Sequence, residues 1–244
     1  MDVRETAGAA GSETGSAKGP KIPVAVFVVI VVGLQTAAWN VASYRLHGSV
    51  DPIYFVLSLF LSINLLICYW EACLYLRRDY IAQRAEYWRG RGAETGRPPA
   101  ILFLFSGIPL TGILSPTAWS DVWAAYSVYD DAYTDRRTFG FNCDVGNGFA
   151  TPVPSMVLLL SMTTGFLPAV VAGILGVALF WQWVYVSSLY MVSFYVSGGH
   201  RAIGRLDRLV WVWAPNTIWV VVPMFGLYVA IRLVLDGTYA VLGH

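Results

Sequence analysis

Long runs of apolar residues separated by short polar segments dominate this chain of 244 residues. A helix needs about 20 apolar residues to cross the ~30 Å hydrocarbon layer of a bilayer. A further apolar stretch, 100–115, is shorter and is broken by Pro109. The pattern predicts an all-α, polytopic membrane helix bundle with five full spans and a short re-entrant segment at 100–115, and six to seven spans is the alternative. The five runs near spanning length are 23–44, 53–76, 151–166, 169–195 and 209–235.

The N-terminal part of the chain differs from the rest. Residues 1–21 are small and polar and contain no apolar core, so they are predicted to be a disordered N-terminal lead. Residues 22–244 hold every apolar run and are predicted to form a single transmembrane domain. The first run is longer than the apolar core of a signal peptide, and we expect it to stay in the protein as an anchor.

Arginine is concentrated in two loops, 77–99 and 198–208. The positive-inside rule places such loops in the cytoplasm. Both are cytoplasmic only when 100–115 does not cross the membrane, and that arrangement puts the N-terminus inside and the C-terminus outside. Ala, Gly and Val are abundant and Arg greatly outnumbers Lys. This bias is typical of a GC-rich genome, so a bacterial plasma membrane is the expected location.

Composition narrows the functional classes. Only 13% of the residues are charged, against about 25% in an average soluble domain, and the net charge is +1. These values exclude a nucleic-acid-binding protein, a disordered tail protein and an ordinary cytosolic enzyme. The three cysteines and three histidines show no metal-type spacing, and no G-x-G-x-x-G nucleotide motif occurs. We therefore predict no metal and no cofactor, and the oligomeric state stays open.

The few acids at membrane depth are the main candidates for chemistry, because a bilayer tolerates a carboxyl group only where it is protonated, paired or next to a cavity. Glu71 lies late in the second run, with Asn64 two helical turns earlier on the same face. A buried carboxylic acid that stays neutral at physiological pH can act as a general acid. The alternative is that Glu71 reaches the membrane interface and pairs there with Arg77 or Arg78.

The segment 116–150 is polar, aromatic and acid-rich and leads into the third predicted span. It is predicted to form the mouth of a site, although Trp and Tyr also collect in membrane-interface belts. Asp144 is expected at or just inside the start of that span, where an acid also suits a helix N-cap or first turn. Asp236 ends the last span, where it either takes part in chemistry or simply marks the exit from the membrane.

Asp130, Asp131 and Asp135 form the sequence DDAYTD, which is similar to the aspartate-rich motifs that hold magnesium and diphosphate in class I terpene synthases and membrane prenyltransferases. Those enzymes need a second metal motif, and this chain shows none. A solvated acidic cluster is the preferred interpretation, and magnesium-dependent prenyl transfer is the alternative.

Residues 123–144, WAAYSVYDDAYTDRRTFGFNCD, resemble the W-x-x-Y … D-x-x-Y … F … C … acid stretch of the emopamil-binding-protein (EXPERA) superfamily, which includes the membrane sterol Δ8–Δ7 isomerases. Matches also occur on that family's last two helices, in the same order along the chain. The resemblance covers about residues 119–230, an EXPERA-like core. The matching positions on the last two helices are Gln182, Tyr185, Asn216, Trp219 and Pro223.

The resemblance implies that Asp144 helps to shuttle a proton at a sterol double bond, with Asn216 and Trp219 lining the pocket. The same isomerases carry a His and a Glu four residues apart on an earlier helix. Asn64 and Cys68 stand at the best-matching positions here. This departure favours a reaction other than sterol isomerisation.

Two short pieces resemble the small membrane-bound terpene cyclases of meroterpenoid and indole-diterpene pathways. Trp70-Glu71 is similar to a Trp-Glu pair on an early helix of those enzymes, and Asp236-Gly-Thr-Tyr239 is similar to an acid-Gly-Ser-Tyr stretch near their C-terminus. The resemblance implies that Glu71 and Asp236 start cyclisation by protonating an alkene or an epoxide.

Together these observations predict a membrane-embedded terpene cyclase or isomerase that protonates a hydrophobic isoprenoid without a cofactor. A sterol Δ8–Δ7-type isomerase and a non-catalytic sterol- or lipid-binding EXPERA protein are the alternatives. The expected partners are a lipid-soluble isoprenoid or sterol-like small molecule and membrane lipids, and not nucleic acid. The predicted catalytic residues are Glu71, Asp144 and Asp236. The predicted substrate-binding residues are Asn64, Trp70, Tyr126, Asp130, Tyr133, Asn147, Gln182, Tyr185, Asn216 and Trp219.

Overall fold

The computed structural model of the chain describes residues 19–244, so residues 1–18 of the predicted lead lie outside the described residues. The end of that lead is corrected, because Lys21 already belongs to a short strand. The longer helices are α1 (Val24–His47), α2 (Pro52–Leu76), α3 (Arg78–Thr95), α7 (Phe139–Ala150), α8 (Pro152–Thr164), α9 (Ala169–Val196) and α11 (Ala214–Asp236). The short elements are β1 (Lys21–Pro23), α4 (Pro99–Leu104), β2 (Gly107–Pro109), η1 (Leu110–Gly112), α5 (Pro116–Trp119), α6 (Asp121–Tyr126), η2 (Asp131–Thr134), η3 (Gly199–Arg201), α10 (Arg205–Asp207), η4 (Arg208–Trp213) and η5 (Ala240–Leu242).

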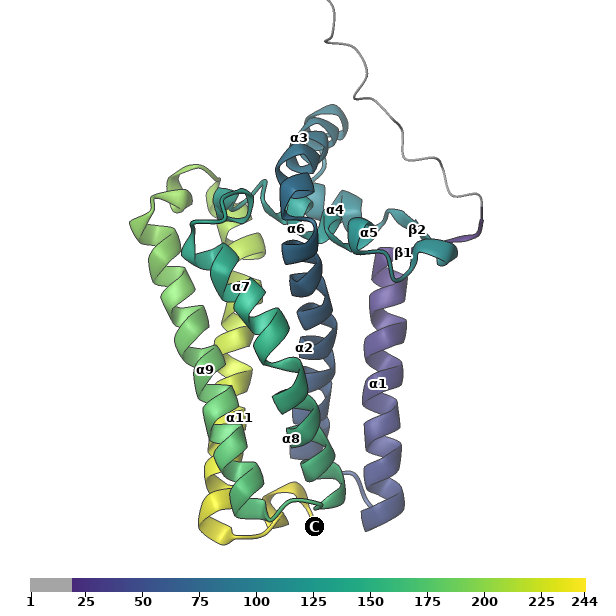
Figure 1. Cartoon of the computed structure of the whole chain (residues 1–244), viewed down its shortest axis with the longest axis vertical. Coiled ribbons are helices and arrows are strands. Elements are labelled where there is room, and N and C mark those ends of the chain that lie inside the picture. The colour runs from purple at the N-terminus through teal and green to yellow at the C-terminus, as the bar shows by residue number, and fades with distance from the viewer. Residues whose placement is uncertain (1–18) are drawn as a thin grey trace, which may run out of the picture.

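The helices α1, α2, α7–α8, α9 and α11 run alongside one another and form an elongated bundle (Figure 1). The elements α3 to α6 and the two strands gather at one end, named here the polar end, and the C-terminus lies at the other. Both arginine-rich loops, 77–99 and 198–208, lie at the polar end. This shared location is the one expected when 100–115 does not cross the membrane.

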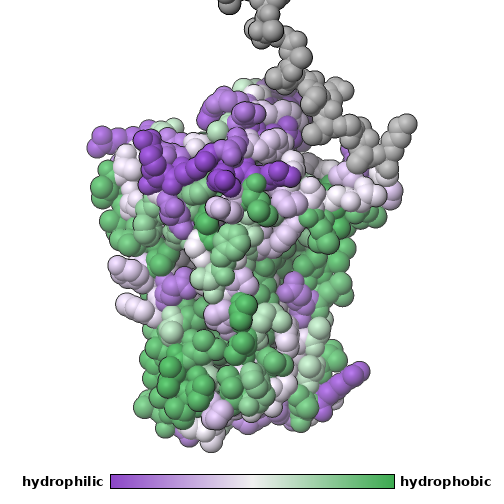
Figure 2. Space-filling model, viewed as in Figure 1, coloured by the Kyte–Doolittle hydropathy of each residue, from purple (hydrophilic) through white to green (hydrophobic). Residues whose placement is uncertain are grey.

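The bundle has the dimensions and surface of an integral membrane protein. Four helical stretches are long and apolar enough to span a bilayer, and α7 with α8 passes the same test only as a pair that is bent by 49°. The described residues therefore contain four candidate spans, or five when the bent pair is one span. Hydrophobic residues cover the length of the bundle, and hydrophilic residues gather at the polar end (Figure 2). The four stretches are Val24–His47, Pro52–Leu76, Ala169–Val196 and Arg205–Asp236.

The boundaries predicted for the third span, 151–166, are wrong. α8 has only 13 residues, or ~20 Å at 1.5 Å per residue, so α8 alone is too short to span, and it reaches spanning length only together with the 12 residues of α7. Glycine and asparagine are frequent in α7 and are poor helix formers, which is why the sequence indicated a loop. Thr138 caps the helix by accepting a hydrogen bond from the N–H of Phe141. Asp144 consequently lies in the second turn of α7, and neither the N-cap nor the first-turn interpretation holds.

The segment 100–115 contains no helix long enough to cross a membrane. It contains the six-residue helix α4, followed by β2 and η1. β2 pairs antiparallel with β1, with Ile22 opposite Ile108, and the N–H of Val24 donates to the carbonyl of Ser106 (3.0 Å). The segment is therefore fastened to the start of α1 at the polar end. Pro109 and the two glycines that interrupt the apolar run prevent a continuous helix.

Small residues allow α9 and α11 to pack more extensively than any other pair of elements. A Cβ added at Gly173 would lie 2.7 Å from the carbonyl oxygen of Ala230, and one added at Gly226 would lie 2.5 Å from the ring of Phe180. Membrane helices associate through such close van der Waals contact, since lipid tails are as apolar as the side chains themselves.

The contact at Gly173 can be tested by substitution. Gly173→Ala is expected to destabilise the protein by about 1–3 kcal/mol, because the backbone of α11 must move to accept the methyl group. Gly33→Ala is the matched control on α1, where an added Cβ meets nothing within 4 Å; it is expected to be neutral or slightly stabilising. The measurement is the melting temperature of each variant in one detergent, and equal melting temperatures would contradict the packing.

Candidate functional site

Two rows of polar side chains, one on α2 and one on α7–α8, face each other inside the bundle. Residues three or four positions apart lie on one face of a helix, and the two segments run in opposite directions, so the rows pair in reverse order. All six residues are buried, and they are named the polar ladder below. The bonded pairs are Glu71 with Asn147 (2.7 Å), Cys68 with Thr151 (3.2 Å) and Asn64 with Ser155 (3.2 Å).

A glycine permits the close approach of α2 and α7 at the first pair. A Cβ added at Gly148 would lie 2.6 Å from the Cβ of Glu71 and 3.0 Å from the backbone of Cys68 and Ala72. A side chain at position 148 would therefore push the helices apart. Its absence lets the neighbouring residue, Asn147, reach Glu71.

The carboxamide of Asn147 joins three helices. Its Oδ1 accepts hydrogen bonds from Nε1 of Trp183 on α9 (2.8 Å) and from Oγ1 of Thr151 (3.0 Å). The indole N–H of Trp183 can only donate, so it fixes which end of the amide faces α9. Nδ2 of Asn147 is left to donate to Oε2 of Glu71 (2.7 Å). The orientation of the group that holds Glu71 is thus set by a tryptophan from another helix.

The interpretation that Glu71 pairs with Arg77 or Arg78 is wrong. Glu71 is 2% exposed and forms no ion pair with a described residue. Arg78 instead donates to the carbonyl of Tyr75 and lies over the Tyr75 ring. The carboxyl group therefore lies inside the bundle, where leaving it without a cation is costly in its charged form.

Thr151 occupies the bend between α7 and α8. Pro152 has no N–H to donate to the preceding turn, and this loss bends a helix. The hydroxyl of Thr151 lies 2.9 Å from the carbonyl oxygen of Asn147 as well as 3.0 Å from its Oδ1, and its one proton is shared between these two acceptors. The bend thus keeps a polar group pointing into the ladder.

A second acid, Asp144, lies one turn before Asn147 on α7, close enough to Glu71 for their charges to interact. Its Oδ2 accepts a hydrogen bond from the hydroxyl of Tyr133 (2.7 Å). The Tyr133 ring stacks on Trp123, with centroids 4.9 Å apart. Asp144 therefore lies between the polar ladder and a cluster of three aromatic residues, Trp123, Tyr126 and Tyr133, which is named the aromatic group below.

Asp130 anchors this aromatic group to α9. It is 4% exposed, and its Oδ2 accepts a hydrogen bond from the hydroxyl of Tyr190 (2.5 Å). The same hydroxyl lies 3.4 Å from that of Tyr126, whose ring meets Tyr133 edge-on. Burial raises the pKa of Asp130, and the hydrogen bond from Tyr190 opposes that rise.

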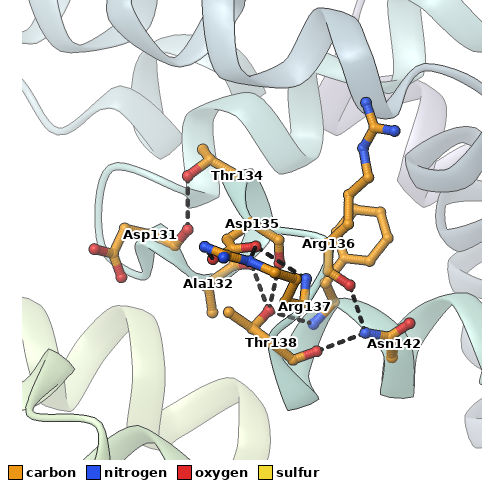
Figure 3. Close-up of polar contacts among 9 residues, drawn as sticks. Asp131, Ala132, Thr134, Asp135, Arg136, Arg137, Thr138 and Asn142 are labelled. Carbon is orange, nitrogen blue, oxygen red and sulfur yellow. Dashed lines mark hydrogen bonds and ion pairs between the residues drawn. The ribbon is translucent and has the colours of Figure 1, made fainter.

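Local hydrogen bonds fix the loop between Asp130 and α7 (Figure 3). Oγ1 of Thr138 donates to the carbonyl of Ala132 (2.7 Å), and Nδ2 of Asn142 donates to the carbonyl of Arg136 (2.7 Å). These bonds attach η2 to the first turn of α7. They hold Tyr133 where its hydroxyl meets Asp144.

The three aspartates of DDAYTD do not converge. Asp130 is bound to Tyr190, Asp131 is exposed, and Asp135 pairs with Arg137, which lowers the pKa of Asp135 to about 2. In the described part of the chain, no group of three or more His, Cys, Asp or Glu residues is arranged to hold a metal ion. The geometry gives no support to magnesium-dependent prenyl transfer.

The predicted residues of α11 lie next to the site. Nδ2 of Asn216 donates to the carbonyl of Val212 (2.7 Å), and the side chain lies near the hydroxyl of Tyr126. Trp219 meets Phe60 edge-on, with centroids 4.7 Å apart, within the core farther from the polar end. Asn216 thus borders the aromatic group, and Trp219 packs below it.

Three other predicted residues are outside the polar ladder. Trp70 stacks on Trp119 in the upper core. Gln182 is half-buried and forms no hydrogen bond with a described residue. Tyr185 is 54% exposed and stacks on Trp181 on the outside of α9. The expectation that Tyr185 lines the site is therefore wrong.

The structure separates Asp236 from the other two acids. Asp236 is exposed and pairs with Arg232 one turn earlier (2.8 Å). It lies at the end of α11 farther from the polar end (Figure 1). Glu71 and Asp236 do not meet, so the two-acid arrangement implied by the cyclase resemblance is not formed.

Sequence reasoning missed five members of the site. Thr151 and Ser155 continue the four-residue spacing from Asn147, but this spacing crosses what was expected to be a loop boundary. The other three are surrounded by apolar or aromatic neighbours that conceal them. These three are Cys68, Trp183 and Tyr190.

The site combines two neighbouring carboxyl groups, tyrosine hydroxyls and aromatic faces within an apolar bundle. Such a set can donate and accept protons and can face a cation with aromatic rings. Comparison with protein-family models and with curated proteins finds no match for this chain.

The bond between Glu71 and Asn147 can be tested with a double-mutant cycle. Asn147→Leu is expected to destabilise the protein by about 1–3 kcal/mol, because it leaves buried polar atoms of Glu71 and Trp183 unpaired. Combining it with Glu71→Leu should cost less than the sum of the two, with a coupling of about 0.5–3 kcal/mol. Unfolding in detergent measures each free energy. Asn147→Leu with Glu86→Leu, at an exposed site, should be additive, and additivity in both pairs would contradict the contact.

Proposed function

We propose that the chain is a membrane-embedded terpene cyclase or isomerase, in which a buried carboxylic acid protonates a double bond or an epoxide of a hydrophobic isoprenoid. The observation that carries the proposal is Glu71, a buried carboxyl group held by Asn147 and without a cationic partner among the described residues. Apolar surroundings favour the neutral form of a carboxylic acid. Protonation of an alkene requires that neutral form.

Asp144 is the proposed partner of Glu71. A cation formed by protonation reaches a neutral product when a proton leaves a neighbouring carbon atom, and a carboxylate can accept that proton. The Tyr133 hydroxyl donates to Asp144 and so stabilises its charged form. One proton enters and one leaves, so the product is an isomer of the substrate.

Aromatic rings next to the two acids support the carbocation chemistry. Trp123, Tyr126 and Tyr133 pack together beside Asp144. The faces of such rings attract a cation, and Trp does so most strongly. Burial inside the bundle also limits the hydration of a carbocation.

We favour cyclisation over a double-bond shift. Asn64 and Cys68 stand where the sterol isomerases carry their His and Glu. Nδ2 of Asn64 donates to Ser155, and the thiol of Cys68 is bonded to the hydroxyl of Thr151. Neither replaces the missing acid or base of an isomerase.

The proposed location is a bacterial plasma membrane, with the N-terminus and the polar end in the cytoplasm. The arginine-rich loops 77–99 and 198–208 share that end, and the positive-inside rule favours the cytoplasm for such loops.

The proposed roles are tested by turnover. Membranes carrying Glu71→Gln or Asp144→Asn are expected to convert polyprenylated aromatics, their epoxides or sterols about 10²–10⁴-fold more slowly, as expected for loss of a general acid or base. Glu94→Gln is the control, since Glu94 is exposed and pairs with Arg91 on α3. Products are measured by mass spectrometry. Unchanged turnover in both acid variants overturns the assignment, and substrate binding without any product in the unmodified protein indicates a carrier instead.

The proposed orientation is tested by labelling intact cells. A membrane-impermeant maleimide is expected to label Thr238→Cys and to label Arg91→Cys only after the membrane is opened, because these exposed positions lie at opposite ends of the bundle. The unmodified protein supplies the background from its own cysteines. The reverse pattern overturns the proposed orientation. Labelling of both positions from the same side would contradict an odd number of membrane crossings between residues 91 and 238.

A further inference from the structure

The polar end has a hollow that the candidate site does not use. It measures about 460 Å³ and lies between the last turns of α3, the start of α4, residues 128–129 and the loop 202–207. Its lining includes Arg89, Arg97 and Tyr129. These segments are distant in sequence, so the hollow is a product of the tertiary fold.

Positive charge predominates around the hollow. Arg97 forms no ion pair with a described residue, whereas Arg89 pairs with Glu86. Arg205 and Arg208 belong to the neighbouring helical segments and also lack an acidic partner among residues 19–244. They line a second hollow of about 530 Å³ together with Leu206, Leu209 and Trp213.

Tyr129 adds a hydrogen-bond donor to this wall. The residue is 6% exposed, and its buried hydroxyl oxygen lies near the backbone N–H of Ala100, while the hydroxyl proton has no acceptor among the described residues. The ring stacks on Trp211, with centroids 5.3 Å apart, which fixes its position. Burial raises the pKa of Tyr129 to about 12, so the hydroxyl keeps its proton at neutral pH. A buried donor without a partner destabilises a fold unless water or a ligand meets it.

We propose that this hollow binds a phosphate group, with Arg97 and Arg89 as the charged donors and Tyr129 as the neutral one. The guanidinium group presents N–H donors in a fork that matches phosphate oxygens. The hollow lies at the end of the bundle where hydrophilic residues gather (Figure 2). Basic pockets at the cytoplasmic ends of membrane helices bind lipid head groups. The phosphate belongs to an anionic lipid or to a soluble phosphate compound.

Asp207 offers a second test of the proposal, because its replacement is expected to change the affinity for phosphate in the opposite direction. It is the one acid in the lining of the hollow and forms no ion pair with a described residue. Its charge repels a phosphate, so Asp207→Asn is expected to tighten binding while the arginine variants weaken it. A hollow that merely fills with water would show neither effect.

The experiment measures binding to the full chain by calorimetry in a lipid-free detergent, with inorganic pyrophosphate as the soluble probe. Arg97→Ala is expected to weaken binding about tenfold or more, since hydrogen bonds to charged groups are the strong ones. Arg91→Ala is the matched control, because Arg91 lies on the same helix, pairs with Glu94 and does not line the hollow. The melting temperature of each variant verifies that it is folded.

A second arm replaces pyrophosphate with nanodiscs of phosphatidylglycerol or phosphatidylcholine and measures bound lipid by native mass spectrometry. Retention of phosphatidylglycerol that Arg97→Ala abolishes and Arg91→Ala preserves assigns the site to lipid head groups. Pyrophosphate binding with the same pattern, and no lipid preference, assigns it to soluble phosphates. No binding of either probe, or equal affinity in the Arg97→Ala and Arg91→Ala proteins, overturns the proposal.

Discussion

Hydrocarbon offers no hydrogen bonds, so a polar side chain inside the bundle depends on partners within the protein. The polar ladder meets this requirement for Glu71: Asn147 reaches it from α7, and Trp183 on α9 fixes the orientation of Asn147. The remaining rungs follow from the same antiparallel alignment of α2 with α7–α8. A buried carboxyl group can therefore persist in an apolar bundle because three helices are held in one register.

That register depends on residues that have no side chain. Gly148 lets α7 approach the backbone of α2, and Gly173 does the same for α9 and α11. Neither glycine contributes chemistry of its own. Each removes the atom that would separate two helices, and this short separation brings the amide of α7 to the acid of α2.

The bundle and its polar end provide two different environments. Within the bundle, Glu71 and Asp144 have aromatic and amide neighbours, and this is where we propose the proton transfer to take place. At the polar end, arginines line open hollows that suit an anion. The loop that carries Asp130 and Tyr133 lies between these two environments. Hydrogen bonds attach this loop to Tyr190 on α9 and to Asp144 on α7.

The length of apolar runs and the clustering of arginine are local properties, and they were enough to predict a helical membrane protein with both arginine-rich loops at one end. The shared face of Asn64 and Glu71 also followed from helical spacing. Other features depend on contacts between distant segments. The pairing of Glu71 with Asn147 joins positions 76 residues apart, and the strand at 107–109 needs a partner at 21–23. Only the tertiary structure decided these features, because the partner of a side chain on one helix depends on which helix packs against it.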